Sequence, residues 1–520
     1  MKTSLSNSLA RSVKPTASAL CLAVFLAACG GGGGGEAPAD SSVPAPAPGA
    51  PPAPAPAPAP APGAPAPAPA PAPAPGAPAP GPAPAPSPAP APTPSAAWQP
   101  EQLLENSNDF NVASTNRFAN VPILTAVAPN GDAMAMWEQS DGLPNGTTLK
   151  IYSRRYTAAT STWESAVVVP GLSTTSRGLV EGRLFIDANG TATWINPRLE
   201  TRRNTVAGGW TTPFLPAVAV NFSNGLSSAV MDASGNIGVL ISSRSEGFGD
   251  GAVFNTVLPP GSTNWTAYSR VQLATSTREG KDARVAISNS GDTTSIATAV
   301  WKEQNPGDNN FSMKASRTTP GSGWGTPVDL EGLFTNVDVE KPAVAMDLVG
   351  NAIAMWCQGG KLYYNLYLMS NNNWQGAVEA DTCSGPIRLA MNPSGKAVAT
   401  WSNGATATLR SMQYSLTTGW TAPVTVDDYN VFNELSIDDS GQAVMTYEYT
   451  VRGTGRFDVA TRRLSFGGVW GDRVLLDTGL GDVNSPQFAM NPAGKGIVIW
   501  TQSDVENSDV RNSLWSAILK

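Results

Sequence analysis

The chain has 520 residues, a formal net charge of −7, four cysteines and no histidine. Without histidine it can build neither Ser-His-Asp or Cys-His nucleophile systems nor the common histidine-ligated zinc and iron sites. The acidic balance, with no basic run, also argues against nucleic acid or anionic lipid headgroups as partners.

The first 28 residues have the features of an export signal. Lys2, Arg11 and Lys14 give a positive start, and residues 19–28 form an apolar stretch that is too short to span a bilayer. We therefore exclude residues 1–28 from the folded protein and interpret them as a signal peptide.

The apolar stretch ends in Leu26-Ala27-Ala28-Cys29. This resembles the lipobox of bacterial lipoproteins, in which the cysteine is lipidated and becomes the first mature residue. The resemblance implies lipidation of Cys29 by chains such as palmitate, and membrane attachment through those chains alone. Gly30 after the cysteine implies the outer membrane, by resemblance to Gram-negative lipoproteins. The sequence leaves open whether the protein faces the periplasm or the cell surface.

Residues 29–97 form the next segment, in which Gly30–Gly35 precedes a Pro-Ala tract over about 43–94. Such a tract lacks large apolar side chains, and its prolines donate no hydrogen bonds, so it cannot form a core. We predict a disordered, extended stalk that reaches on the order of 150 Å at ~3.1 Å per residue.

Between about residue 122 and residue 500, a motif returns eight times. It reads apolar-x-apolar, then usually Asp or Asn, two residues, Gly, and alternating small and apolar residues that often end in Trp. The clearest copies are 343–356 and 389–401. The marker glycines are Gly131, Gly190, Gly235, Gly291, Gly350, Gly395, Gly441 and Gly494, which lie 45 to 59 residues apart. A period near 50 with strand-like alternation is typical of a radial all-β array.

Each unit predicts four strands, A to D. In the sixth unit, strand A precedes Asn392, an Asx-x-x-Gly turn follows, and strand B ends at Trp401. Strand C covers Leu409–Tyr414, and a Gly-rich turn leads to strand D over Gly419–Val426. The seven strand-D tryptophans after a strand C are Trp163, Trp210, Trp265, Trp324, Trp374, Trp420 and Trp470.

The eighth unit stops after its strand C, Val510–Leu519. The missing strand-D pattern occurs at the other end of the folded region, in Trp98–Leu104. We predict that this N-terminal segment completes the last sheet and closes the array, because closure removes the open edges.

These repeats resemble those of bacterial envelope β-propellers, through their Asp/Asn-x-x-Gly and Gly-x-Trp motifs, and the architecture is distantly sialidase-like. The resemblance covers residues 98–520 and implies an all-β propeller of four-stranded blades. Eight blades is our count, with seven as the fallback because copies two to four are degenerate. We expect a monomer.

The repeated residues have structural roles in this interpretation. The strand-D tryptophans are expected to act as wedges between blades. Asp187, Asp232, Asp347 and Asp438 are expected to be turn residues rather than metal ligands.

Function is expected on the face formed by the B–C and D–A connections, which are long and varied. They include the B–C loops Glu138–Thr148 and Thr501–Asp509 and the D–A loop Asp427–Asn433. Cys357 and Cys383 fall on this face, and export permits a disulfide between them; the alternative is two unpaired thiols.

The leading functional hypothesis is a non-enzymatic binding or scaffold module for an envelope glycan or protein. One alternative is a carbohydrate-active hydrolase of sialidase-like architecture, although the sialidase Ser-x-Asp-x-Gly-x-Thr-Trp box and Arg-Ile-Pro motif do not occur. Another is an outer-membrane assembly factor. We assign no catalytic, cofactor or metal residue; Ca²⁺ is the only ion considered, with Asn305–Asn310 as a faint candidate.

Overall fold

The computed structural model describes residues 97–520, except for gaps at 107–111, 113–122, 141–148, 172–178, 180–181, 217–225, 244–251, 273–277, 289–294, 307–309, 320–321, 333–336, 404–407, 429, 452–454, 480 and 506–507. The predicted signal peptide, Cys29 and nearly all of the predicted stalk lie outside the described residues.

The repeated motif folds into eight antiparallel sheets, or blades, in which neighbouring strands of the chain pair in sequence order. Blade 1 contains β2 (Ile123–Val127), β3 (Ala133–Ser140), β4 (Leu149–Thr157), β5 (Thr162–Trp163) and β6 (Val167–Val168). Blade 2 contains β7 (Arg183–Ile186), β8 (Ala192–Ile195), β9 (Thr201–Thr205) and β10 (Gly209–Trp210). Blade 3 contains β11 (Leu226–Met231), β12 (Ile237–Ser243), β13 (Ala252–Leu258) and β14 (Ser269–Arg270).

Blade 4 contains β15 (Gly280–Ile287), β16 (Ala297–Gln304), β17 (Phe311–Thr319), β18 (Gly323–Trp324) and β19 (Val328–Asp329). Blade 5 contains β20 (Val339–Met346), β21 (Ala352–Gln358), β22 (Lys361–Leu368), β23 (Asn373–Trp374) and β24 (Val378–Thr382). Blade 6 contains β25 (Ile387–Met391), β26 (Ala397–Asn403), β27 (Thr408–Ser415), β28 (Gly419–Trp420) and β29 (Val424–Asp428).

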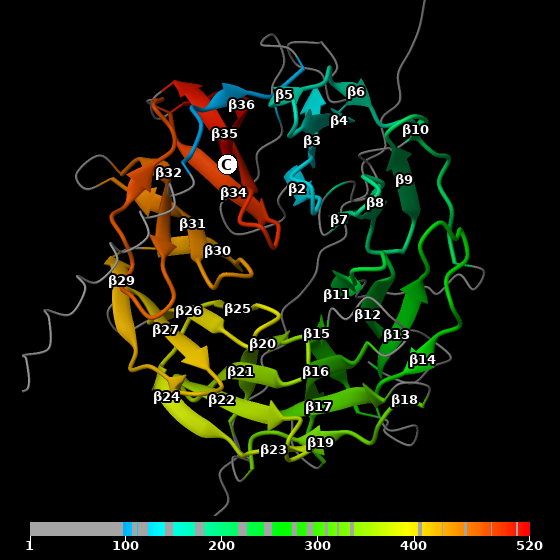
Figure 1. The fold of residues 1–520 in the computed structure, drawn as a ribbon, viewed down its shortest axis with the longest axis vertical. Coiled ribbons are helices and arrows are strands. Elements are labelled where there is room, and N and C mark those ends of the chain that lie inside the picture. Colours follow the sequence, from blue (N-terminus) through cyan, green and yellow to red (C-terminus); the bar gives the residue numbers. More distant parts are fainter. Residues whose placement is uncertain are drawn as a thin grey trace, which may run out of the picture. The chain divides into compact units, whose positions relative to one another are not determined.

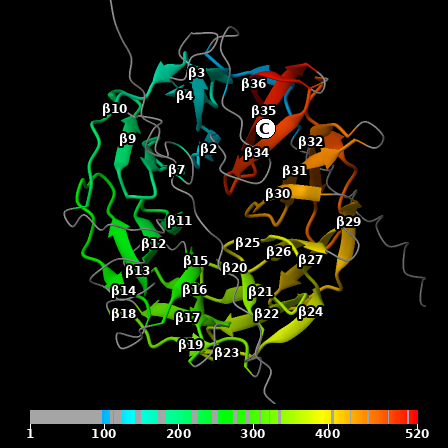
Figure 2. The ribbon, with the colours of Figure 1, turned by 180° about the vertical axis from the view of Figure 1, so that it is seen from behind.

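Blade 7 contains β30 (Asn430–Ile437), β31 (Ala443–Thr450), β32 (Phe457–Leu464) and β33 (Val474–Leu475). Blade 8 contains β34 (Val483–Met490), β35 (Gly496–Val505), β36 (Ser508–Leu519) and β1 (Gln102–Leu103). The blades stand in a ring, with the first strand of each nearest the centre (Figure 1; Figure 2 from behind). The prediction of an eight-bladed, all-β propeller is therefore confirmed for the described residues.

The ring closes as predicted. Strand β1 pairs antiparallel with β36, with Gln102 opposite Ser516 and Leu103 opposite Trp515. Trp98 bridges to Leu519, so the whole N-terminal segment follows the last strand C. In Figure 1, the blue segment from the start of the folded region lies beside the red end of the chain. The outer edge of β36 is therefore covered by a strand from the other end of the folded region.

The cores lie between adjacent blades. The strand-B tryptophans Trp137, Trp194, Trp301, Trp356, Trp401 and Trp500 have no exposed surface. The strand-D tryptophans pack against the preceding blade: Trp210 contacts the blade 1–2 cluster, and its indole Nε1 donates to Ser153 Oγ of blade 1 at 2.8 Å. Trp98 packs in the same way into the cluster between blades 7 and 8. The wedge role predicted for these tryptophans is confirmed.

Strand D differs from the prediction because several blades break it into two short segments. In blade 6, β28 and β29 both pair with β27 and are separated by residues 421–423, which include Pro423. Blade 4 has the same arrangement with Pro327 between β18 and β19. Proline has no amide hydrogen for the ladder, so pairing stops and then resumes with a shifted register.

Candidate functional site

One face of the ring carries A–B turns that share one backbone hydrogen-bond pattern in seven blades, while the turn of blade 4 lies outside the described residues. In blade 5, Asp347 Oδ1 accepts hydrogen bonds of 2.8 Å from the amides of Gly350 and Asn351, and Oδ2 accepts one of 2.6 Å from Asn351 Nδ2. Gly350 has φ +104°, a conformation that favours glycine. Asp187, Asp232, Asn392, Asp438 and Asn491 likewise accept hydrogen bonds from amides of their own turns. The turn roles predicted for the four aspartates are therefore confirmed.

The opposite face carries the B–C and D–A connections, and these vary. The B–C connections range from two residues between β21 and β22 to eight between β3 and β4. Several predicted loops are nevertheless wrong in their bounds. Most of the predicted loop 501–509 belongs to strands, because β35 continues to Val505 and β36 begins at Ser508. Asp427 similarly belongs to β29.

The longer B strands reflect a motif that the sequence prediction missed, Trp-x-Gln or Trp-x-Glu. In blade 5, Trp356 Nε1 donates to Gln358 Oε1 at 3.2 Å, and Gln358 Nε2 donates to Glu331 Oε2 at 2.8 Å. The same indole bond joins Trp137 to Gln139, Trp301 to Glu303, and Trp500 to Gln502. The signal was the Gln or Glu two positions after each of these four tryptophans. This side chain accepts the hydrogen bond of the buried indole, and it extends strand B toward the face that carries the varied B–C and D–A connections.

Cys357 lies next to the end of strand β21, and Cys383 follows β24 on the same face. Their Cα atoms are 5.7 Å apart, and their sulfur atoms are in bonding contact. Both residues are buried. This spacing is compatible with the disulfide predicted from the sequence. The bond would join the B–C turn of blade 5 to its D–A connection.

Two buried carboxylates near this face have opposite pKa shifts. Burial opposes ionisation of Asp427, but hydrogen bonds from Arg473 and Tyr447 outweigh it and hold its pKa below the usual range. Burial, and then the nearby charge of Asp458, raise the pKa of Asp477 to about 7. Asp477 Oδ1 accepts from the amide of Val459 at 3.0 Å. Asp427 is therefore held as an ion pair with Arg473, whereas Asp477 titrates near neutral pH.

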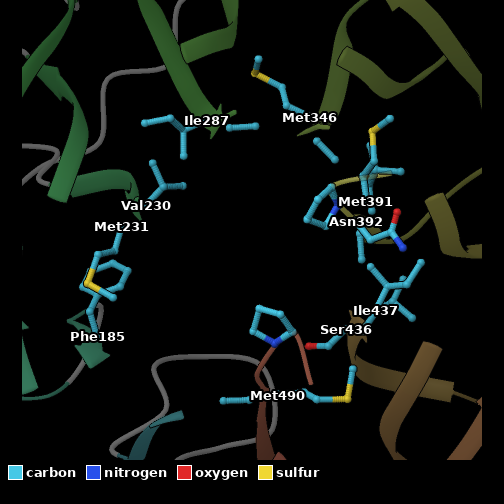
Figure 3. A pocket seen from close by; sticks show the side chains of 18 of the residues that line it. Phe185, Val230, Met231, Ile287, Met346, Met391, Asn392, Ser436, Ile437 and Met490 are labelled. Carbon is cyan, nitrogen blue, oxygen red and sulfur yellow. The ribbon is translucent and has the colours of Figure 1, made fainter. Parts of the chain in front are cut away.

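An axial cavity of about 600 Å³ lies at the centre of the ring and is lined by the A strands of all eight blades. Figure 3 shows Val230, Met346, Met391, Ile437 and Met490 around this space. Its lining reaches the A–B turns at Asp347, Asn392 and Asp439. The cavity is mostly apolar along the strands and polar at the turn face, and its size falls within the range of ligand pockets.

Charged side chains occur next to this apolar lining. Arg388 Nε lies 3.6 Å from Glu434 Oε2, and each side chain is 29% exposed. Burial raises the pKa of Glu434, while Arg388 and Arg183 oppose the rise. An ionisable group inside a propeller channel is a candidate for ligand contact. The sequence prediction gave these residues no role because their blades are far apart in the chain.

The residues described hold no group of three or more His, Cys, Asp or Glu side chains placed to share a metal ion. The calcium candidate Asn305–Asn310 lies partly outside the described residues, which omit 307–309. Within the described part of the chain, no helix is long and apolar enough to cross a membrane.

Comparisons with known proteins return distant structural matches. No family model and no curated protein matches the chain. A protein of unknown function from Dyadobacter fermentans is 11% identical, with a TM-score of 0.36 over 82% of this chain and all of that one. The Dos1 propeller is 7% identical, with a TM-score of 0.48 over 81% of this chain and 95% of that one.

A third solved structure, the Hadza microbial sialidase Hz136, is 11% identical, with a TM-score of 0.35 over 56% of this chain and 64% of the sialidase. Similarities of this size carry no activity or residue role over to the chain. What the described residues establish is an eight-bladed β-propeller, closed by its own N-terminal strand, with one uniform face and one varied face.

Proposed function

We propose that this protein is a non-enzymatic binding module whose varied face takes a glycan or protein ligand in the bacterial cell envelope. The observation that carries the proposal is the contrast between the two faces. The A–B turns repeat one hydrogen-bonded geometry, while the opposite connections differ in length and composition. Variable loops on a rigid scaffold are where recognition usually occurs.

The proposal includes display at the outer membrane. Support comes from the lipobox-like segment at 26–29 and the Pro-Ala tract behind it. Two or more acyl chains on Cys29 would anchor the protein, and an extended stalk would separate the propeller from the membrane.

Anchoring is tested by growing cells with radiolabelled palmitate and fractionating their membranes. The expected result is label on the wild-type chain in the outer membrane, and no label on the Cys29→Ala variant. Cys21→Ala is the matched control and should be labelled like wild type. An unlabelled wild-type chain would refute the anchor without bearing on the propeller.

Ligand binding is tested on a glycan array and by pull-down from envelope extract, with loop variants as controls. Replacement of residues 141–148, which connect β3 to β4, by a short Gly-Ser loop alters one B–C connection, while Ser394→Ala alters a uniform turn. Loss of binding in the first variant alone is expected. Release of cleaved sugar by the wild-type protein would instead favour the hydrolase alternative.

A further inference from the structure

A cleft of about 690 Å³ lies between blades 2 and 3, on the face that carries the A–B turns. Blade 2 lines it from its A–B turn, at Asp187 and Asn189, across strands β8 and β9 to the residues that follow β10. Blade 3 lines the other side with Gly235 of its A–B turn and Pro260 of its C–D turn. Both turns of blade 3 lie at the same end of its sheet, because its strands are antiparallel.

Neighbouring A–B turns are tied together elsewhere in the ring. Asn392 Nδ2 of blade 6 donates to the carbonyl oxygen of Asp438 in blade 7 at 3.0 Å. Asn491 Nδ2 of blade 8 donates to the carbonyl oxygen of Ala128 in blade 1 at 3.0 Å. Asp187 occupies the same place in blade 2, but an ionised carboxylate has no hydrogen to donate. The turn of blade 2 therefore cannot make this bond to the turn of blade 3.

The turns of blades 2 and 3 are also farther apart. A Cβ atom placed on Gly395 of blade 6 would lie 3.2 Å from Asp347 Oδ2 of blade 5. A Cβ atom placed on Gly235 of blade 3 would lie 3.9 Å from Asp187 Oδ2 of blade 2. The wider spacing leaves room beside the Asp187 carboxylate.

Asp187 has one oxygen available in this space. Its Oδ1 accepts hydrogen bonds from the amides of Asn189 at 2.9 Å and Thr191 at 2.8 Å. In blades 3 and 5, the second oxygen of the equivalent aspartate accepts from an asparagine four positions later, as Asp347 does from Asn351. Blade 2 has Thr191 at that position, and no described residue donates to Asp187 Oδ2. An anionic acceptor is therefore open at the cleft.

Threonine hydroxyls supply donors around the cleft. Thr205 Oγ1 accepts from the amide of Gly208 at 3.0 Å, and Thr211 Oγ1 accepts from the amide of Arg203 at 3.1 Å. Each oxygen acts as an acceptor in these bonds, so its hydroxyl hydrogen can be donated to a ligand. Further threonines that line the cleft are Thr191, Thr193, Thr212 and Thr263.

The cleft also has an aromatic surface and balanced charge. Phe214 lines it, and its backbone is held by hydrogen bonds to and from Thr201 at 2.9 and 3.0 Å. The Arg203 guanidinium lies 5.4 Å from the centre of the Phe214 ring, and its two Nη atoms donate to carbonyl oxygens of blade 3. Among the described residues that line the cleft, only Asp187 and Arg203 are charged, so their charges cancel.

We propose that the cleft between blades 2 and 3 binds a neutral sugar residue. Sugar hydroxyls both donate and accept hydrogen bonds, so they match an open carboxylate oxygen beside hydroxyl donors. The apolar C–H face of a sugar ring can pack on Phe214. Charged ligands are disfavoured, because Asp187 repels anions and Arg203 repels cations in the same cleft. The site goes beyond the function proposed for the varied face and does not depend on it.

The test uses saturation-transfer difference NMR on the chain from residue 30 onward, which keeps every described residue. The probes are lactose, maltose, cellobiose and N,N′-diacetylchitobiose, with digalacturonate and chitobiose as anionic and cationic counterparts. At least one neutral disaccharide should receive saturation on its ring protons, and titration then gives its dissociation constant. The charged disaccharides should bind more weakly.

Asp187→Asn is the main variant. It should keep the turn, because Asn392 and Asn491 occupy the same place in blades 6 and 8, but it replaces the open acceptor by a donor. We expect disaccharide affinity to fall by about tenfold or more, since a charge-assisted hydrogen bond is lost. Phe214→Leu keeps an apolar side chain without the ring and should weaken binding severalfold. Asp438→Asn makes the same change in a turn outside the cleft and should leave the affinity unchanged.

Thermal unfolding of the three variants checks that each is folded. No transfer to any neutral disaccharide, tighter binding of the charged ones, or equal affinity in wild type and Asp187→Asn would overturn the proposal. Loss of sugar binding on replacement of residues 141–148, but not in Asp187→Asn, would place the sugar on the varied face. That result would overturn the cleft and support the function proposed above.

Discussion

The backbone amide of Leu104 donates a hydrogen bond of 2.7 Å to the carbonyl oxygen of Leu514, which joins the two ends of the folded region. Both side chains are fully buried in the cluster shared by blades 8 and 1. The last blade is therefore built from both ends of the propeller sequence, and its core also belongs to the first blade. Loss of this junction should affect the stability of the whole ring.

Leu104→Ala tests the closure. Removing a fully buried leucine should lower the free energy of unfolding by about 2–5 kcal/mol, because it leaves a cavity in the junction. Leu103→Ala is the matched control, since Leu103 is 36% exposed on the same segment and should cost much less. Urea denaturation followed by tryptophan fluorescence measures both. Equal losses in the two variants would contradict a buried closing strand.

Asp347→Ala tests the uniform turns. The substitution leaves the amides of Gly350 and Asn351 without their acceptor in a turn where Asp347 is 2% exposed. We expect a loss of about 1–3 kcal/mol per unsatisfied donor, measured by chemical denaturation. Asp439 is an exposed residue next to Asp438 in the blade 7 turn, and it serves as the control. Asp439→Ala should change the free energy of unfolding by less than about 0.5 kcal/mol. A stable Asp347→Ala variant would show that glycine alone supports the turn.

The cysteine pair gives a redox prediction. Peptide mapping under non-reducing conditions should recover Cys357 and Cys383 in one linked species. Reduction should lower the free energy of unfolding by about 3 kcal/mol, because a bond across 26 residues restricts the unfolded chain. The Cys357→Ala/Cys383→Ala variant should show no effect of reductant. Two titratable thiols in the oxidised protein would contradict the pairing.

Asp477 gives a pH prediction. Its pKa in the folded state is raised to about 7 from a usual value of 3.8, so the folded protein binds a proton that the unfolded chain releases between these values. Stability should therefore be greatest below pH 4 with respect to this group, and should fall as pH rises toward 7. The total change is at most about 4 kcal/mol, since a tenfold difference in proton affinity between the folded and unfolded states corresponds to about 1.4 kcal/mol.

The measurement for Asp477 is the urea midpoint at pH 5 and pH 7.5 for wild type and Asp477→Asn. The amide cannot ionise, so the variant should lose less stability between these pH values than wild type does. Asp427→Asn is an informative comparison, because the pKa of Asp427 is held low and its ion pair with Arg473 stays charged across the same range. An identical pH response in wild type and Asp477→Asn would refute the assignment.

The sequence by itself determined the architecture of the propeller. The turn glycines and the strand-D tryptophans recur once per unit, because every blade needs the same tight turn and the same packing against its neighbour. The blade number and the borrowed strand Trp98–Leu104 could therefore be predicted. Strand ends were less predictable, because the Trp-x-Gln pairs that extend β3, β21 and β35 depend on partners in other strands, such as Glu331 for Gln358.

Only the tertiary structure decided what lies at the centre. Arg183, Arg284, Arg388 and Glu434 are separated by about 50 to 100 residues along the chain, and no local motif relates them. They meet because ring closure brings the same register position of four A strands around one axis. The repeat period of the sequence reflects interactions within each blade. A group of single side chains from different blades, by contrast, comes together only once the ring has closed.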